Sequence, residues 1–175
     1  MQQLISLLVE NKPGALMRVA GVLTSRGYNI ESLTVAKTVD PTLSIMTIVA
    51  EVGDGGRDLL IKQISRLVNV IKAVDLTESR AVRRELVLIK IHVEEGRRPA
   101  LLTDAEIFRA HVVDASPEAY TIEATGSPDK LNALIAVLRS YGPIEMVRSG
   151  AMAMARAKQN KLPVPSYTEA ALSEG

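Results

Sequence analysis

The sequence has no cysteine and no tryptophan, and aromatic residues make up only 3% of it. Without cysteine, disulfides, thiolate nucleophiles and thiolate metal ligands are excluded. The scarcity of aromatic side chains leaves no stacking platform for nucleic-acid bases. The 21 basic and 20 acidic residues nearly cancel, so the sequence also lacks the positive charge excess typical of a nucleic-acid-binding protein.

Long hydrophobic runs are also missing. No apolar stretch approaches the roughly 20 residues that span a bilayer, and the N-terminus does not have the pattern of a signal peptide. We therefore expect a cytoplasmic protein that begins near Met1. With 175 residues, of which 47% are hydrophobic, the chain can form one ordinary domain or two small ones.

The first half of the chain predicts the order strand, helix, strand, strand, helix, strand. The helix follows from apolar residues at helical spacing, with Pro13 at its first position and Gly27 as a left-handed stop. Asp40 and Pro41 are typical of a tight turn between two strands. The predicted elements are a strand at 4–9, a helix at 13–26, a hairpin of strands at 28–39 and 42–52, a helix around 60–68 and a strand at 70–76.

The second half repeats this order. Val87, Ile89 and Ile91 alternate with polar residues, which predicts a half-buried strand. The predicted elements are a strand at 85–94, a helix at 97–109, a hairpin of strands at 111–115 and 120–125, a helix at 128–140 and a strand at 144–147. We therefore expect an α+β fold of two ferredoxin-like βαββαβ modules, whose antiparallel sheets carry helices on one face. The domains are predicted at 1–78 and 82–158, and residues 159–175 are predicted to form a mobile tail.

Two turns flank the first predicted helix and are candidates for ligand binding. The first spans residues 11–16 and the second spans residues 26–30. Gly14 has no helix-propensity reason to stand in a first turn, and close approach of a ligand would explain it. Free N–H groups at a helix start attract a carboxylate, and the amides of Asn11 and Asn29 suit a zwitterionic amino acid. A capped turn with Gly14 as a purely structural glycine is the alternative interpretation.

Several segments closely resemble the regulatory (small) subunit of acetohydroxyacid synthase, also called acetolactate synthase. In the first half, the resemblance rests on the opening strand and on residues 10–16, 25–35 and 40–44. In the second half, it rests on residues 106–109, 114–120, 126–131 and 147–150. The resemblance covers the chain up to about Lys158.

This resemblance implies that the first module is an ACT domain and that the chain is not an enzyme. Members of the family bind a catalytic subunit, raise its activity and confer feedback inhibition by a branched-chain amino acid, usually valine. Thiamine diphosphate, Mg²⁺ and FAD are then expected only in the catalytic subunit. Homodimerisation through the ACT domains is expected as well, with no nucleic-acid or membrane partner.

By this analogy, the amino-acid effector lies between the first loop of one protomer and the second strand of its partner. Asn11 and Asn29 would hold the amino and carboxylate groups, and Leu16 and Ile30 would contact the aliphatic side chain. The complete set of expected effector-binding residues is Asn11, Gly14, Ala15, Leu16, Asn29 and Ile30.

Other residues suggest weaker hypotheses. His92 and His111 could seed a metal site with Glu94 or Asp114, although solvent-facing histidine is the favoured interpretation and no metal is expected. Met152 and Met154 could form an adaptable binding surface or could simply pack a chain end.

Two alternative functions also follow from the sequence. The chain could be an ACT-domain sensor that regulates a different enzyme, and the C-terminal resemblance argues against this. It could also be a free-standing enzyme, because ferredoxin-like folds host many chemistries. The sequence shows no catalytic set of residues.

Overall fold

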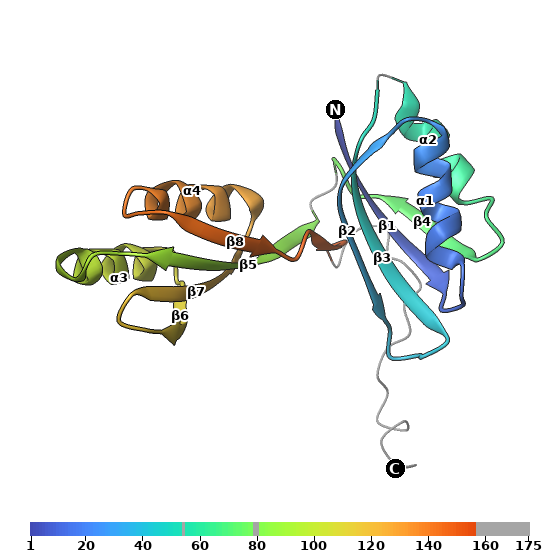
Figure 1. Ribbon diagram of the computed structural model, residues 1–175. Coiled ribbons are helices and arrows are strands. Elements are labelled where there is room, and N and C mark those ends of the chain that lie inside the picture. The colour runs from blue at the N-terminus through green and yellow to red at the C-terminus, as the bar shows by residue number, and fades with distance from the viewer. Residues whose placement is uncertain (54, 79–80, 157–175) are drawn as a thin grey trace, which may run out of the picture. The chain divides into compact units, whose positions relative to one another are not determined.

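A computed structural model describes residues 1–53, 55–78 and 81–156 of the chain (Figure 1). The chain divides into two compact units. The first consists of Met1–Val82 together with the C-terminal segment that begins at Ala151, and the second is Arg83–Gly150. The tail predicted at 159–175 lies outside the described residues. No helix in the described part is long and apolar enough to cross a membrane.

The first unit is a four-stranded antiparallel sheet with two helices on one face (Figure 1). Its strand order is β2-β3-β1-β4, which makes β2 an edge strand. A hydrophobic core fills the space between sheet and helices, because Ile5, Leu7 and Ile48 are fully buried against Val19 and Leu23. The elements are β1 (Gln2–Glu10), α1 (Ala15–Ser25), β2 (Asn29–Lys37), β3 (Leu43–Glu51), α2 (Gly56–Ile64) and β4 (Val70–Asp75).

The start of the first helix differs from the prediction. Pro13 was expected at the first helical position, but α1 begins at Ala15. The cause is Gly14, which has a φ of 85° and lies in the left-handed region, so the chain enters the helix only after it. The predicted stop is confirmed, since Gly27 has a φ of 69° just beyond the helix end.

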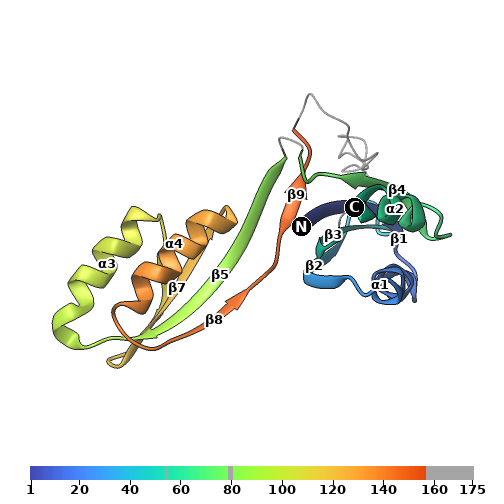
Figure 2. The same ribbon diagram turned by 90° about the horizontal axis from the view of Figure 1, so that it is seen from above.

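The second unit repeats this architecture, with α3 and α4 on the same side of its sheet (Figure 2). Its strand order is β6-β7-β5-β8, and β9 pairs with β5 off this path. The predicted alternation is confirmed, because Val87, Ile89 and Ile91 are fully buried in its core. The elements are β5 (Val82–His92), the 3₁₀ turn η1 (Glu95–Arg97), α3 (Arg98–Ile107), β6 (His111–Ala115), β7 (Ala119–Gly126), α4 (Pro128–Arg139) and β8 (Ile144–Arg148). The short strand β9 (Met152–Met154) belongs to the C-terminal segment of the first unit. The α+β fold of two ferredoxin-like modules is therefore confirmed.

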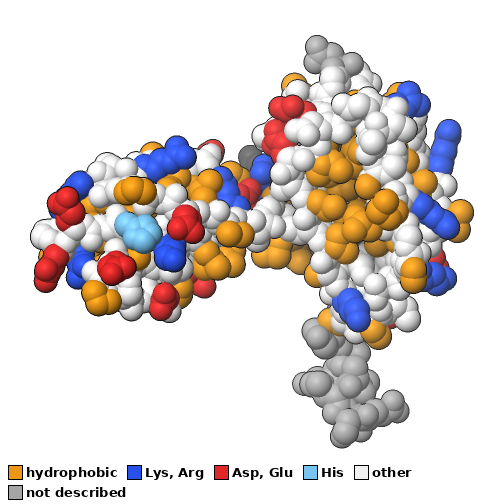
Figure 3. All heavy atoms as spheres, viewed as in Figure 1, with side chains coloured by type: hydrophobic (Ala, Val, Ile, Leu, Met, Phe, Trp, Pro, Cys, Tyr) orange, Lys and Arg blue, Asp and Glu red, His pale blue; other side chains and the backbone are white. Residues whose placement is uncertain are grey.

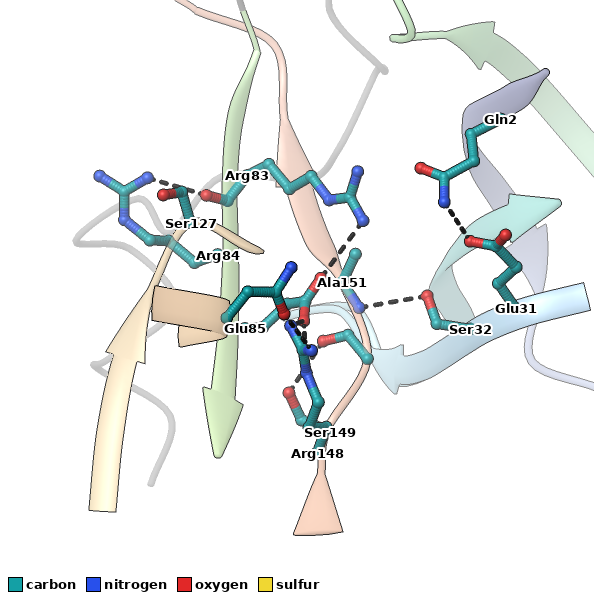
Figure 4. Close-up of polar contacts among 12 residues, drawn as sticks. Gln2, Glu31, Ser32, Arg83, Arg84, Glu85, Ser127, Arg148, Ser149 and Ala151 are labelled. Atoms are coloured by element: carbon teal, nitrogen blue, oxygen red, sulfur yellow. Dashed lines mark hydrogen bonds and ion pairs between the residues drawn. The ribbon is translucent and has the colours of Figure 1, made fainter. Parts of the chain in front are cut away.

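The C-terminal segment from Ala151 returns to the first unit. The predicted domains, 1–78 and 82–158, are continuous ranges and do not include this return. Ala151 is fully buried and packs with Leu4, Val49 and Leu76. Its N–H donates to Ser32 Oγ at 3.3 Å (Figure 4), and its carbonyl accepts from the Thr34 hydroxyl at 3.0 Å.

Alternation along this segment distinguishes the two interpretations of its methionines. Ala153 and Ala155 pack against the same apolar cluster as Ala151, whereas Met152 and Met154 are 56% and 69% exposed. The alanines therefore pack the segment, and the methionine side chains lie at the surface.

A buried carboxylate stabilises the second sheet. Glu85 on β5 is almost fully buried, and it accepts hydrogen bonds from Nε and Nη2 of Arg148 at 3.1 and 2.5 Å (Figure 4). Arg83 adds a third hydrogen bond to Glu85 at 3.2 Å. Arg148, on β8, also donates to Asn132 on α4 at 2.8 Å. This one arginine therefore connects β8 with both β5 and α4.

Candidate functional site

The loop between β1 and α1 is held against the β2–β3 turn by Asn11. The backbone N–H of Asn11 donates to the carbonyl of Thr42 at 2.7 Å, and its side-chain amide donates to the carbonyl of Pro41 at 2.8 Å. Asn11 is nevertheless exposed, and its side-chain oxygen has no hydrogen-bond partner within the described residues. Asn11 therefore both fixes the loop and retains an acceptor for a ligand.

The start of α1 is open to a ligand. Gly14 is exposed, and a Cβ atom placed on it would have no atom within 4 Å. No side chain caps this helix start. The Ala15 N–H donates to the carbonyl of Lys12 at 3.2 Å, and the next N–H groups of the first turn, those of Leu16 and Met17, are available to an anion. Leu16 is 40% exposed beside this opening, whereas Ala15 is only 5% exposed and packs inward.

A polar network behind the loop involves residues that the sequence analysis did not identify. Arg18 on α1 donates to the side-chain oxygen of Asn69 at 2.8 Å, and the Asn69 amide donates to the Glu10 carboxylate at 2.8 Å. Hydrogen bonds from Lys12 and then from Asn69 lower the pKa of Glu10. No periodicity marks Asn69, because it lies in the connection before β4, so only the structure identifies it.

The expected site also includes Asn29 and Ile30. These two residues lie at the end of the first sheet that is far from the loop containing Asn11. Glu10 pairs with Leu43 on β3, whereas Asn29 pairs with Glu51. Eight residues of extended strand separate these positions, or about 27 Å. A single chain therefore does not bring Asn29 and Ile30 together with the loop that contains Asn11.

The edge strand β2 offers a surface for pairing. No strand of the described residues pairs with its outer side, and Val35 is 44% exposed while Ile30 and Leu33 are half-buried. Hydrophobic side chains gather on the visible face of the first unit over this sheet (Figure 3). Another protomer could cover this strand.

The histidines do not form a metal site with each other. His92 on β5 pairs with Ala119 and His111 on β6 pairs with Glu123, on opposite sides of β7. Their positions are offset along β7 by four residues, or about 13 Å. Among the described residues, no group of three or more histidine or acidic side chains could hold a metal ion. The visible face of the second unit mixes basic, acidic, histidine and hydrophobic side chains (Figure 3).

Comparison with known protein families matches both units. Residues 5–72 match the ACT domain described as "AHAS small subunit-like", and residues 84–157 match the family "Small subunit of acetolactate synthase". The two matches correspond to the two ferredoxin-like modules.

Individual relatives agree with these matches. A probable acetolactate synthase small subunit of Archaeoglobus fulgidus is 46% identical over 91% of this chain and 99% of its own length. The acetolactate synthase small subunit of Haemophilus influenzae is 44% identical over 93% of this chain and 100% of its own. The crystal structure of the acetolactate synthase small subunit from Thermotoga maritima is 36% identical, covers 91% of this chain and 99% of its own, and has a TM-score of 0.79.

Proposed function

Because the chain belongs to the acetolactate synthase small-subunit family and is therefore a regulatory subunit, we propose that it binds the catalytic subunit, raises its activity and makes it sensitive to a branched-chain amino acid. Valine is the effector that we propose. The chemistry, with thiamine diphosphate, Mg²⁺ and FAD, is assigned to the catalytic subunit, and this chain is proposed to have no catalytic activity of its own.

The observation that carries the proposal is the separation of the two halves of the candidate site. Asn11 and Gly14 lie at one end of the first sheet, and Asn29 lies at the other. Two copies that pair antiparallel along β2 would bring the Asn29 end of each protomer to the loop of its partner. A two-fold interface of this kind repeats every contact, so it would create two equivalent effector sites per dimer.

The residues at this junction match the chemistry of a branched-chain amino acid. The uncapped start of α1 offers N–H groups to the carboxylate. The free side-chain oxygen of Asn11 can accept from the ammonium group. Leu16 and Ile30 offer apolar surface to the aliphatic side chain.

Replacement of Gly14 by aspartate tests the site in the complete holoenzyme. A negative charge at the helix start would repel the effector carboxylate, and we expect the half-inhibitory valine concentration to rise about 100-fold. Activation of the catalytic subunit should persist, because the new side chain meets open space and aspartate tolerates the left-handed region.

Gly14→Asn is the matched control, because asparagine has the same shape and the same backbone tolerance without the charge. We expect this variant to keep most of its valine sensitivity. An aspartate variant that responds to valine as the parent does would show that Gly14 is only a structural glycine.

A further inference from the structure

The outer edge of the second sheet is exposed to solvent. Among the described strands, β6 pairs with β7 alone, and all five of its residues are exposed. Val112 and Val113 at its centre are 41% and 53% exposed, and Ile107 at the end of α3 is 72% exposed. Exposed edge strands in natural proteins are usually protected against pairing by charges, proline or short length. The β6 edge, defined as residues 111–115, is short, contains Asp114 and has a β-bulge, but Val112 and Val113 still expose apolar surface at its centre.

Two polar residues of the β6 edge lie on the same face of the sheet. His111 pairs with Glu123 and Asp114 pairs with Thr121, with a bulge between them. Glu123 and Thr121 are two residues apart on β7 and flank the buried Ile122, so they point to the face opposite the core. His111 and Asp114 therefore both point to the open face.

Both side chains are available for a partner. The side chains of His111 and Asp114 make no hydrogen bond or ion pair within the described part of the chain, and both residues are exposed. A strand with the order histidine, valine, valine, aspartate is complementary to a second copy of itself. In an antiparallel pair centred on the two valines, each histidine lies opposite an aspartate, so that an imidazole N–H can donate to the carboxylate, and this contact forms twice by symmetry.

We propose that the β6 edge is a self-association site, at which two copies of this chain join their second-unit sheets antiparallel with His111 opposite the partner's Asp114. The main chain of each strand then satisfies N–H and C=O groups of the other, and the four valines become covered. This proposal does not depend on the effector-dependent dimer, which uses β2 of the first unit, so each can fail alone.

The absence of cysteine allows a clean cross-linking test on the full chain. Val113→Cys places a thiol beside the proposed two-fold axis, where a short bifunctional maleimide would link two copies. Val147→Cys on β8 is the matched control, because Val147 is 70% exposed on a strand at the other edge of the same sheet. We expect the Val113→Cys chain to cross-link about tenfold faster than the control.

Charge exchange then tests the register. In the Val113→Cys background, Asp114→Lys places lysine opposite histidine, and His111→Asp places two aspartates opposite each other. We expect each change to slow self-cross-linking about tenfold. A mixture of the two variants, distinguished by a tag, should cross-link to each other at the parent rate, because their charges are complementary. This recovery also shows that both variants are folded.

Three outcomes would overturn the proposal. In the first, Val113→Cys links no faster than Val147→Cys. In the second, the charge changes have no effect, or the mixture shows no recovery. In the third, the Val113→Cys chain cross-links to the catalytic subunit in the holoenzyme and not to itself, which would assign the β6 edge to that partner.

Discussion

Gly142 is the position at which the structure permits the sharpest stability prediction. It lies in the turn between α4 and β8, and a Cβ atom placed on it would come within 2.2 Å of the backbone carbonyl oxygen of His92. Ordinary van der Waals contact begins at 3.4 Å, so the two backbone segments would have to move apart by more than an ångström. The neighbour is main chain at the end of β5 and cannot rotate away. Glycine is therefore required here by close approach.

The cost of Gly142→Ala follows from two contributions. Overpacking of this kind costs about 1–3 kcal/mol. The separation would also break the hydrogen bond from the His92 N–H to the Pro143 carbonyl, now 3.3 Å, which adds about 1 kcal/mol. We expect a loss of about 2–4 kcal/mol in the free energy of unfolding of the second unit.

Amide hydrogen exchange is the appropriate measurement, because it reports on each of the two compact units separately. Amides of β5 and α4 should lose protection in Gly142→Ala, and amides of β1 and β3 in the first unit should not. The control is Gly21→Ala, since Gly21 lies inside α1 with nothing within 4 Å of the added Cβ. That change should raise first-unit stability by about 1 kcal/mol. Unchanged protection of β5 in Gly142→Ala would refute the argument.

Two further predictions concern pH and the shared site. Burial would raise the pKa of Asp75, but hydrogen bonds from Thr77 and Gln3 and the nearby Arg57 together lower it. The stability that Asp75 contributes is therefore present above its unfolded pKa and lost as pH falls through the folded pKa. Asp75→Asn should destabilise the first unit by about 1 kcal/mol at neutral pH, and denaturant titrations should show this difference shrinking below about pH 4. For the shared site, valine at 100 times its Kd should stabilise the full chain by about 2.7 kcal/mol per site, and Asn29→Ala should reduce this by about 1–3 kcal/mol in thermal melts. A protein that sediments as a monomer and still binds valine tightly would contradict a site shared between protomers.

Sequence reasoning identified most of the elements, because their signals are local. Val87, Ile89 and Ile91 alternate so regularly that a strand with one buried face is the direct expectation, and the structure buries all three. Gly27 ends α1 as predicted, since the left-handed region strongly favours glycine. The helix start was misplaced because Pro13 and Gly14 both suit a first turn, and only the φ of Gly14 excludes it from the helix.

The features that sequence reasoning missed depend on contacts between distant segments. Arg18, Asn69 and Glu10 meet behind the loop although 51 residues separate Arg18 from Asn69. The strand β9 is only three residues long, too short for an alternation of alanine and methionine to predict it.

The return of the chain at Ala151 has a consequence for biosynthesis. The far face of the first sheet, where Leu4, Val49 and Leu76 cluster, is covered within the described chain by a segment that begins at Ala151, 76 residues beyond the end of β4 at Asp75. A nascent chain that has already made all four strands of the first unit still exposes this apolar face while the ribosome synthesises the entire second unit. Premature termination anywhere in the second unit would therefore leave an exposed, aggregation-prone apolar face on the first unit, even though all four strands of its sheet are present. Chaperones or proteases could thus detect incomplete synthesis through the apolar surface that the missing segment would have covered.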